Sequence, residues 1–86
     1  MKTIWKYPIE IHEYFNIDMP KDAEVLSIQD QKGIICMWVL VNPHNQLERR
    51  GFRIYPTGQP VEYNGDYIGT FQLSGGDIIL HLFEDE

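Results

Sequence analysis

Proline and glycine residues divide this chain into short segments along its whole length. The breaks fall at Pro8, Pro20, Gly33, Pro43, Gly51, Pro56, Gly58, Pro60, Gly65 and Gly75-Gly76. The segments between them are rich in Ile, Val, Tyr, Phe and Trp, which favour a pleated backbone. No segment repeats apolar residues at the three- and four-residue spacing of an amphipathic helix. This punctuation predicts an all-β protein.

The segments predict seven strands, at about residues 2–7, 12–18, 23–30, 34–42, 47–55, 66–73 and 77–84. Turn-forming residues between them predict hairpins at 30–33, 42–45 and 74–77. Because sequential strands usually pair, we expect a small antiparallel sandwich or barrel of about six to seven short strands in a meander. A chain of 86 residues has no room for a second core, so residues 1–86 are expected to form a single β domain.

The segment from Ile34 to Val41 is apolar on both of its faces, and residues 78–83 nearly repeat this pattern. A strand that is apolar on both faces is covered on both sides. In so small a domain the second cover predicts a homo-oligomer, although a tightly curled barrel explains the pattern too. Cys36 is the only cysteine and lies inside the apolar run, which predicts a buried thiol in a reducing compartment.

Acidic residues outnumber basic ones by 13 to 7, giving a formal net charge of −6. Duplex DNA binding draws its affinity from many basic groups, so this balance argues against it. No apolar run approaches the roughly 20 residues that span a bilayer, and no signal peptide is visible, so we expect a cytoplasmic protein with no membrane partner. The acidic end, residues 84–86, is expected to be a solvated terminus.

All three arginines, Arg49, Arg50 and Arg53, fall within five consecutive residues. In a regular strand, Arg49 and Arg53 share one face with Tyr55, across Gly51, while Arg50 lies on the other. Guanidinium groups bind phosphates and carboxylates in a bidentate manner, and a glycine permits close backbone approach.

The Thr57-Gly58 turn adds a hydroxyl and a free backbone amide beside this face. The candidate ligand-binding residues are therefore Arg49, Arg53, Tyr55 and Thr57, for a small anionic ligand of nucleotide type. The alternative is that these arginines form cross-strand ion pairs with the many carboxylates. Tyr63 and Tyr67 lie near turns and are further candidates for stacking on a ligand or anchoring a protein partner.

Catalytic and metal-binding patterns are not found in the sequence. His12, His44 and His81 lie in separate segments without zinc-ligand spacing, and His81 is expected to be hydrogen-bonded and partly buried. Neither serine lies in a Gly-x-Ser-x-Gly elbow, and burial would make the Cys36 thiol inert. We therefore expect no enzyme, no cofactor and no metal.

Several segments together resemble an uncharacterised family of small proteins from bacteriophages and prophages. The similar segments are Met1–Pro8, Met19–Ser27, Phe52–Gly58, Tyr67–Gln72 and Gly76–Glu84. They are spread over nearly the whole chain, although the family more often has glycine where this chain has Pro56. The family has no established activity, so the resemblance transfers no functional residues.

What the resemblance implies is a context, the cytoplasm of an infected host. Small phage accessory proteins without enzymatic motifs often act against host defence. On this basis we expect a counter-defence protein that sequesters an anionic, nucleotide-like immune signal through the arginine-rich strand. Direct inhibition of a host defence protein through the acidic surface is the alternative, and a virion or assembly component is the third possibility.

Overall fold

The computed structural model describes residues 1–86 and contains seven β-strands and one short 3-10 turn. The strands are β1 (Thr3–Pro8), β2 (Tyr14–Pro20), β3 (Glu24–Gln31), β4 (Ile34–Val41), β5 (Leu47–Pro56), β6 (Gly65–Leu73) and β7 (Ile78–Asp85). Each lies within two residues of its predicted position, so the all-β prediction is confirmed. None of the elements is a helix with the length and apolarity needed to cross a membrane.

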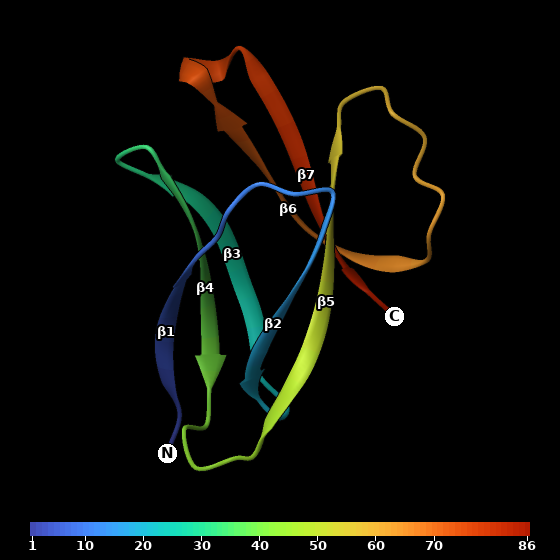
Figure 1. Ribbon diagram of the computed structural model, residues 1–86. Coiled ribbons are helices and arrows are strands. Elements are labelled where there is room, and N and C mark those ends of the chain that lie inside the picture. The colour runs from blue at the N-terminus through green and yellow to red at the C-terminus, as the bar shows by residue number, and fades with distance from the viewer.

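The strands form two antiparallel sheets that pack as a sandwich (Figure 1). The first sheet has the order β1-β4-β3 and the second the order β2-β5-β7-β6. The predicted sandwich is therefore confirmed, but its strands do not follow a meander. Only β3–β4 and β6–β7 are hydrogen-bonded neighbours in both sequence and space.

The turns explain which strands form hairpins. Lys32 and Gly33 both have positive φ, 53° and 88°, and the Gly33 amide donates to the Asp30 carboxylate over 2.7 Å, which closes a tight turn between β3 and β4. The Ser74–Gly76 turn likewise joins β6 to β7. The segment after Asn42 instead carries the chain from one sheet to the other, so the expected hairpin between β4 and β5 does not form.

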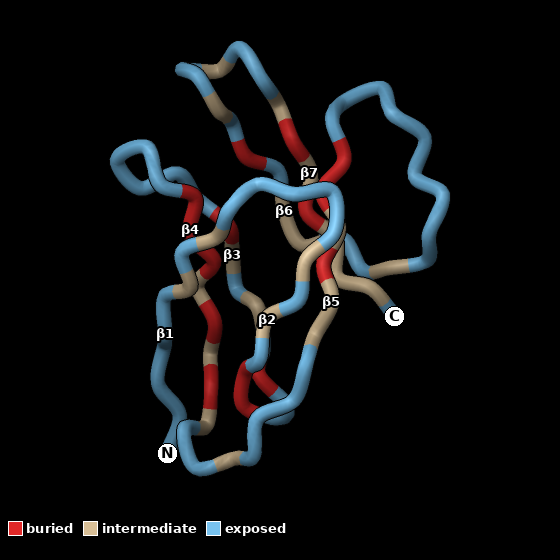
Figure 2. The backbone as a smooth tube through the Cα atoms, viewed as in Figure 1, coloured by how far each residue is buried: buried red, intermediate tan, exposed pale blue.

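The core lies between the two sheets, as the buried segments of β4, β5 and β7 show (Figure 2). Side chains alternate along these strands, and the inward ones form one apolar cluster. At its centre Phe52 is fully buried and stacks on Phe15, with ring centroids 5.5 Å apart. Leu80 and Leu82 of β7 complete the cluster beside them.

The outer face of β4 is apolar as well, as the sequence predicts. Cys36 is buried there as expected, while Trp38 is half-buried beneath the Lys6 ammonium group, which lies 5.9 Å from its ring centroid. Ile4 and Ile34 are more than half exposed on this face. A homo-oligomer stays a prediction.

Tyr7 gives the fold a pH dependence on the alkaline side. The residue packs against the core, and burial raises the pKa of its phenol above the ordinary value of 10.0. A folded-state pKa above the unfolded one contributes stability that is present below pH 10 and lost as the pH rises through the folded value. We expect the urea midpoint to fall above pH 10 and expect Tyr7→Phe to reduce that fall, with an unchanged midpoint at pH 7. An identical alkaline decline in both proteins would contradict this origin.

Candidate functional site

The arginine-rich strand β5 alternates as the sequence predicts. Phe52 and Ile54 enter the core, whereas Arg49, Arg53 and Tyr55 belong to the outer face of the second sheet. The pairing of β5 with β2 places Tyr14 directly across from Arg53. The three candidate residues on β5 therefore share a face, but their surroundings differ.

Arg53 is held between two tyrosine rings. Its guanidinium carbon lies 3.7 Å from the ring centroid of Tyr63 and 4.6 Å from that of Tyr14. Its Nε donates a hydrogen bond to the Asp85 carboxylate over 2.9 Å. Aromatic stacking and a carboxylate together fix the plane of the guanidinium, while its two terminal nitrogens make no hydrogen bond within the chain.

The ring of Tyr14 occupies the space above Gly51, between Arg49 and Arg53. A Cβ atom on Gly51 would lie 2.8 Å from the Tyr14 phenol oxygen, which also donates to Asn16 over 3.0 Å. Gly51 therefore makes room for a ring of the protein itself. Arg49 stands apart, with 73% of its side chain exposed and its Nε 3.6 Å from the Asp18 carboxylate.

Tyr55 and Thr57 lie beyond Arg53 along the chain. Tyr55 is only 6% exposed, meets Phe83 edge-on at 5.5 Å between centroids, and buries a hydroxyl that has no hydrogen-bond partner. Its phenol is therefore covered by the protein. Thr57 is exposed, and its hydroxyl makes a hydrogen bond of 2.8 Å with Nε2 of His81.

His81 is the centre of a chain of hydrogen bonds on the same face. Its Nδ1 lies 2.8 Å from the Thr70 hydroxyl, which lies 2.6 Å from the Tyr67 phenol oxygen. Both ring nitrogens are therefore occupied, which confirms the expectation of a hydrogen-bonded, partly buried histidine. This network holds Tyr67 and Thr57 in place on either side of the ring.

Arg50 lies on the opposite side of β5 and links the two sheets. Its guanidinium makes a forked ion pair with Glu84 and also donates to the carbonyl of Ala23, just before β3, over 2.6 Å. The hydrogen bond to Glu84 raises the pKa of Arg50 above its ordinary value, against the opposing effect of burial. The side chains are 15% and 21% exposed, so this pair is largely removed from water.

The expectation of a solvated acidic terminus is thus wrong for Glu84 and Asp85 and holds only for the exposed Glu86. Glu84 and Asp85 belong to β7 and pair with Arg50 and Arg53. With Asp18 beside Arg49, every arginine has a carboxylate partner. Cross-strand ion pairing, the alternative interpretation of the arginine cluster, is therefore present in the structure.

Together these residues make a continuous aromatic and cationic surface, which we call the Tyr–Arg face: Tyr14, Arg53, Tyr63, Tyr67 and Phe83. The sequence points to Arg53, Tyr63 and Tyr67, but it misses Tyr14 and the Asp85 partner. Alternation of polar residues along Tyr14, Asn16 and Asp18 marks an outward face, but no local signal pairs that strand with β5.

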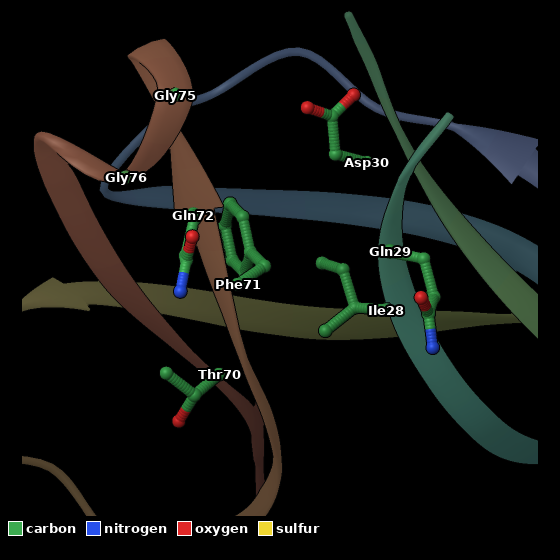
Figure 3. A pocket seen from close by; sticks show the side chains of 8 residues that line it. All are labelled: Ile28, Gln29, Asp30, Thr70, Phe71, Gln72, Gly75 and Gly76. Atoms are coloured by element: carbon green, nitrogen blue, oxygen red, sulfur yellow. The ribbon is translucent and has the colours of Figure 1, made fainter. Parts of the chain in front are cut away.

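The hollows of the molecule lie elsewhere. The largest, of about 340 Å³, opens between β3 and β6 (Figure 3). Two smaller ones, of about 210 and 200 Å³, flank the loop around His12. None is lined by Arg49, Arg53, Tyr55 or Thr57. No group of His, Cys, Asp and Glu side chains is arranged to hold a metal ion.

Comparison with known proteins leaves the activity open. No curated protein and no solved structure matches the chain. One family model matches it over residues 1–86, and that family is uncharacterised. The chain belongs to the family described as Domain of unknown function (DUF7352).

Proposed function

We propose that this protein is a non-enzymatic binding protein and that the Tyr–Arg face is its working surface. The observation that carries the proposal is the position of Arg53, held between Tyr14 and Tyr63. This arrangement presents a fixed guanidinium plane and two rings that remain about half exposed. The acid and base groups nearby are engaged in pairs, Asp85 with Arg53 and His81 with two hydroxyls, which favours binding over proton-transfer chemistry.

The shape of this face favours a protein partner. Small-molecule sites are concave, but none of the three hollows of the molecule is lined by a residue of this face. Tyrosine and arginine are enriched among the residues that dominate protein–protein binding energy. Rings that are already held by hydrogen bonds, such as Tyr14 and Tyr67, lose little further freedom when a partner binds.

Charge narrows the class of partner. The chain carries a formal net charge of −6, and the exposed Asp18 lies at the edge of the Tyr–Arg face. The net negative charge of the molecule attracts a basic protein and speeds its association at low salt. In the phage setting that the resemblance implies, the partner is a host defence factor and the outcome is its direct inhibition in the host cytoplasm.

Sequestration of an anionic, nucleotide-like signal is the second candidate. The observation in its favour is that the terminal nitrogens of Arg53 make no hydrogen bond within the chain, beside the exposed ring of Tyr63. A phosphate would compete there with the resident Asp85 carboxylate. If sequestration operates, cyclic or ADP-ribose-type nucleotides raise the melting temperature of the wild type and not of Arg53→Ala.

A comparative pull-down tests the proposed partner class. We expect Tyr63→Ala to reduce recovery of a specific host protein about tenfold or more, because half-exposed tyrosines at the centre of an interface act as hot spots. Added salt should weaken the same complex. The matched control is Ile34→Ala, which removes an equally exposed apolar side chain from the opposite sheet. Equal recovery with both variants would refute a role for the Tyr–Arg face.

A further inference from the structure

The two sheets of the sandwich leave an open seam between strands β3 and β6. A cavity of about 340 Å³ lies in it, and its lining includes Ile28, Asp30, Phe71, Gln72 and the Gly75-Gly76 turn. Figure 3 shows the side chains of Ile28 and Phe71 turned toward each other between the two strands, with Asp30 above them on the side of the glycine turn. We call this cavity the seam cleft.

The β3 side of the seam cleft is an unpaired strand edge. Along an antiparallel strand, the N–H and C=O groups of one residue point toward the neighbouring strand on one side, and those of the next residue point toward the opposite side. The Ile9 amide donates to the Ile35 carbonyl over 2.9 Å. The backbone N–H and C=O groups of the odd-numbered residues of β4 therefore point toward β1, and those of the even-numbered residues point toward β3. After the bulge in β3, those even-numbered residues pair with odd-numbered residues of β3. The backbone groups of Ile28 and Asp30 therefore point away from β4, toward the free edge of the sheet.

The β6 side is an unpaired edge for the same reason. The Thr57 amide donates to the Ile79 carbonyl over 3.3 Å, so the backbone groups of the odd-numbered residues of β7 point toward β5 and those of the even-numbered residues point toward β6. The even-numbered residues of β7 pair with Gly69, Phe71 and Leu73. The backbone groups of Thr70 and Gln72 are left facing outward, and both residues line the seam cleft.

These two edges lie beside each other and open toward their hairpin tips. They come close where a Cβ on Gly69 would lie 3.1 Å from Cγ2 of Ile28, and they diverge toward the β3–β4 and β6–β7 turns (Figure 1). Strand edges are commonly protected by bulges, but both bulges here lie near the other ends of these strands, at Val25/Ser27 and Tyr67/Gly69. The backbone groups next to the seam cleft are therefore unprotected.

We propose that the seam cleft binds an extended peptide segment of a partner protein by β-strand addition, with a lysine or arginine of that segment beside Asp30. The unpaired groups of Ile28, Asp30, Thr70 and Gln72 supply donors and acceptors, as in other edge-strand complexes. Ile28 and Phe71 form an apolar floor that would contact every second side chain of the bound peptide. One oxygen of Asp30 accepts from Gly33, and the other remains for a cation. The seam cleft shares no residue with the Tyr–Arg face, although the hydroxyl of Thr70 contacts Tyr67, and this proposal goes beyond the proposed function.

Isothermal titration of the intact chain with short blocked peptides tests this proposal. Three peptides are compared, in which valine alternates with lysine in the first, with glutamate in the second and with serine in the third. We expect saturable binding that is strongest for the lysine peptide. Methylating alternate amide nitrogens of that peptide should raise its Kd about tenfold, because the side chains remain while the ladder hydrogen bonds are lost.

Two variants of the chain locate the binding. Asp30→Asn keeps the oxygen that accepts from Gly33 but removes the charge, so the Kd of the lysine peptide should rise about threefold and the serine peptide should be unaffected. Tyr63→Ala should leave peptide binding unchanged, which separates this surface from the proposed function. The proposal is overturned if no peptide saturates below about 1 mM. Equal binding of the methylated and unmethylated peptides overturns it as well.

Discussion

Replacing Phe52 with alanine is expected to lower the free energy of unfolding by about 3–5 kcal/mol. Phe52 is fully buried at the centre of the sandwich and stacks on Phe15. Its removal leaves a cavity between two sheets whose strands are fixed by their ladders, so the neighbours can close it only in part. A domain of this size has a total stability on the order of 5–10 kcal/mol, so the variant should lose roughly half of its stability and remain measurable by urea unfolding.

Urea unfolding followed by tryptophan fluorescence measures this change. The matched control is Phe52→Leu, which keeps most of the buried volume and should cost only about 1–1.5 kcal/mol. A loss below about 1 kcal/mol for the alanine variant would mean that Phe52 does not lie at the centre of the core.

Replacing Arg50 with alanine is the second large expected effect, a loss of about 2–3 kcal/mol. The variant leaves the Glu84 carboxylate without its partner in a site that is 21% exposed, and it removes the hydrogen bond to the Ala23 carbonyl that joins the two sheets. Breaking a buried pair by deleting one partner costs more than an exposed pair because the remaining charge is poorly hydrated.

Arg49→Ala provides the control, since it removes the same charge from an exposed pair and should change stability by less than about 0.5 kcal/mol. A double-mutant cycle with Glu84→Gln then isolates the coupling. Equal effects for Arg49→Ala and Arg50→Ala would contradict a sheet-linking role for Arg50.

The strands could be predicted from sequence because the signals for them are local. Proline and glycine mark the breaks, and Gly33, which adopts a positive φ, marks the turn between β3 and β4. The strand order could not be predicted in the same way. Asn42 and Leu47 are separated by a short turn, yet the chain crosses there from one sheet to the other. Which strands pair is decided by burial of distant faces, and no short segment encodes that choice.

The candidate site shows the same division. Alternation places Arg49 and Arg53 on one face and Arg50 on the other, and the structure agrees. Their partners come from β2 and β7, which are distant in sequence, so the sequence does not predict the ring of Tyr14 over Gly51. For the same reason, the sequence predicts a solvated tail at Asp85, whereas its carboxylate pairs with Arg53 in the structure.

Native mass spectrometry of the protein isolated from cells that produce it decides between a protein partner and a small ligand, because one spectrum detects both. If the Tyr–Arg face binds a protein, the spectrum contains a complex with a second, basic polypeptide that is retained with Ile34→Ala and lost with Tyr63→Ala. A small anionic adduct lost with Arg53→Ala, with no second polypeptide, would contradict it and favour sequestration instead.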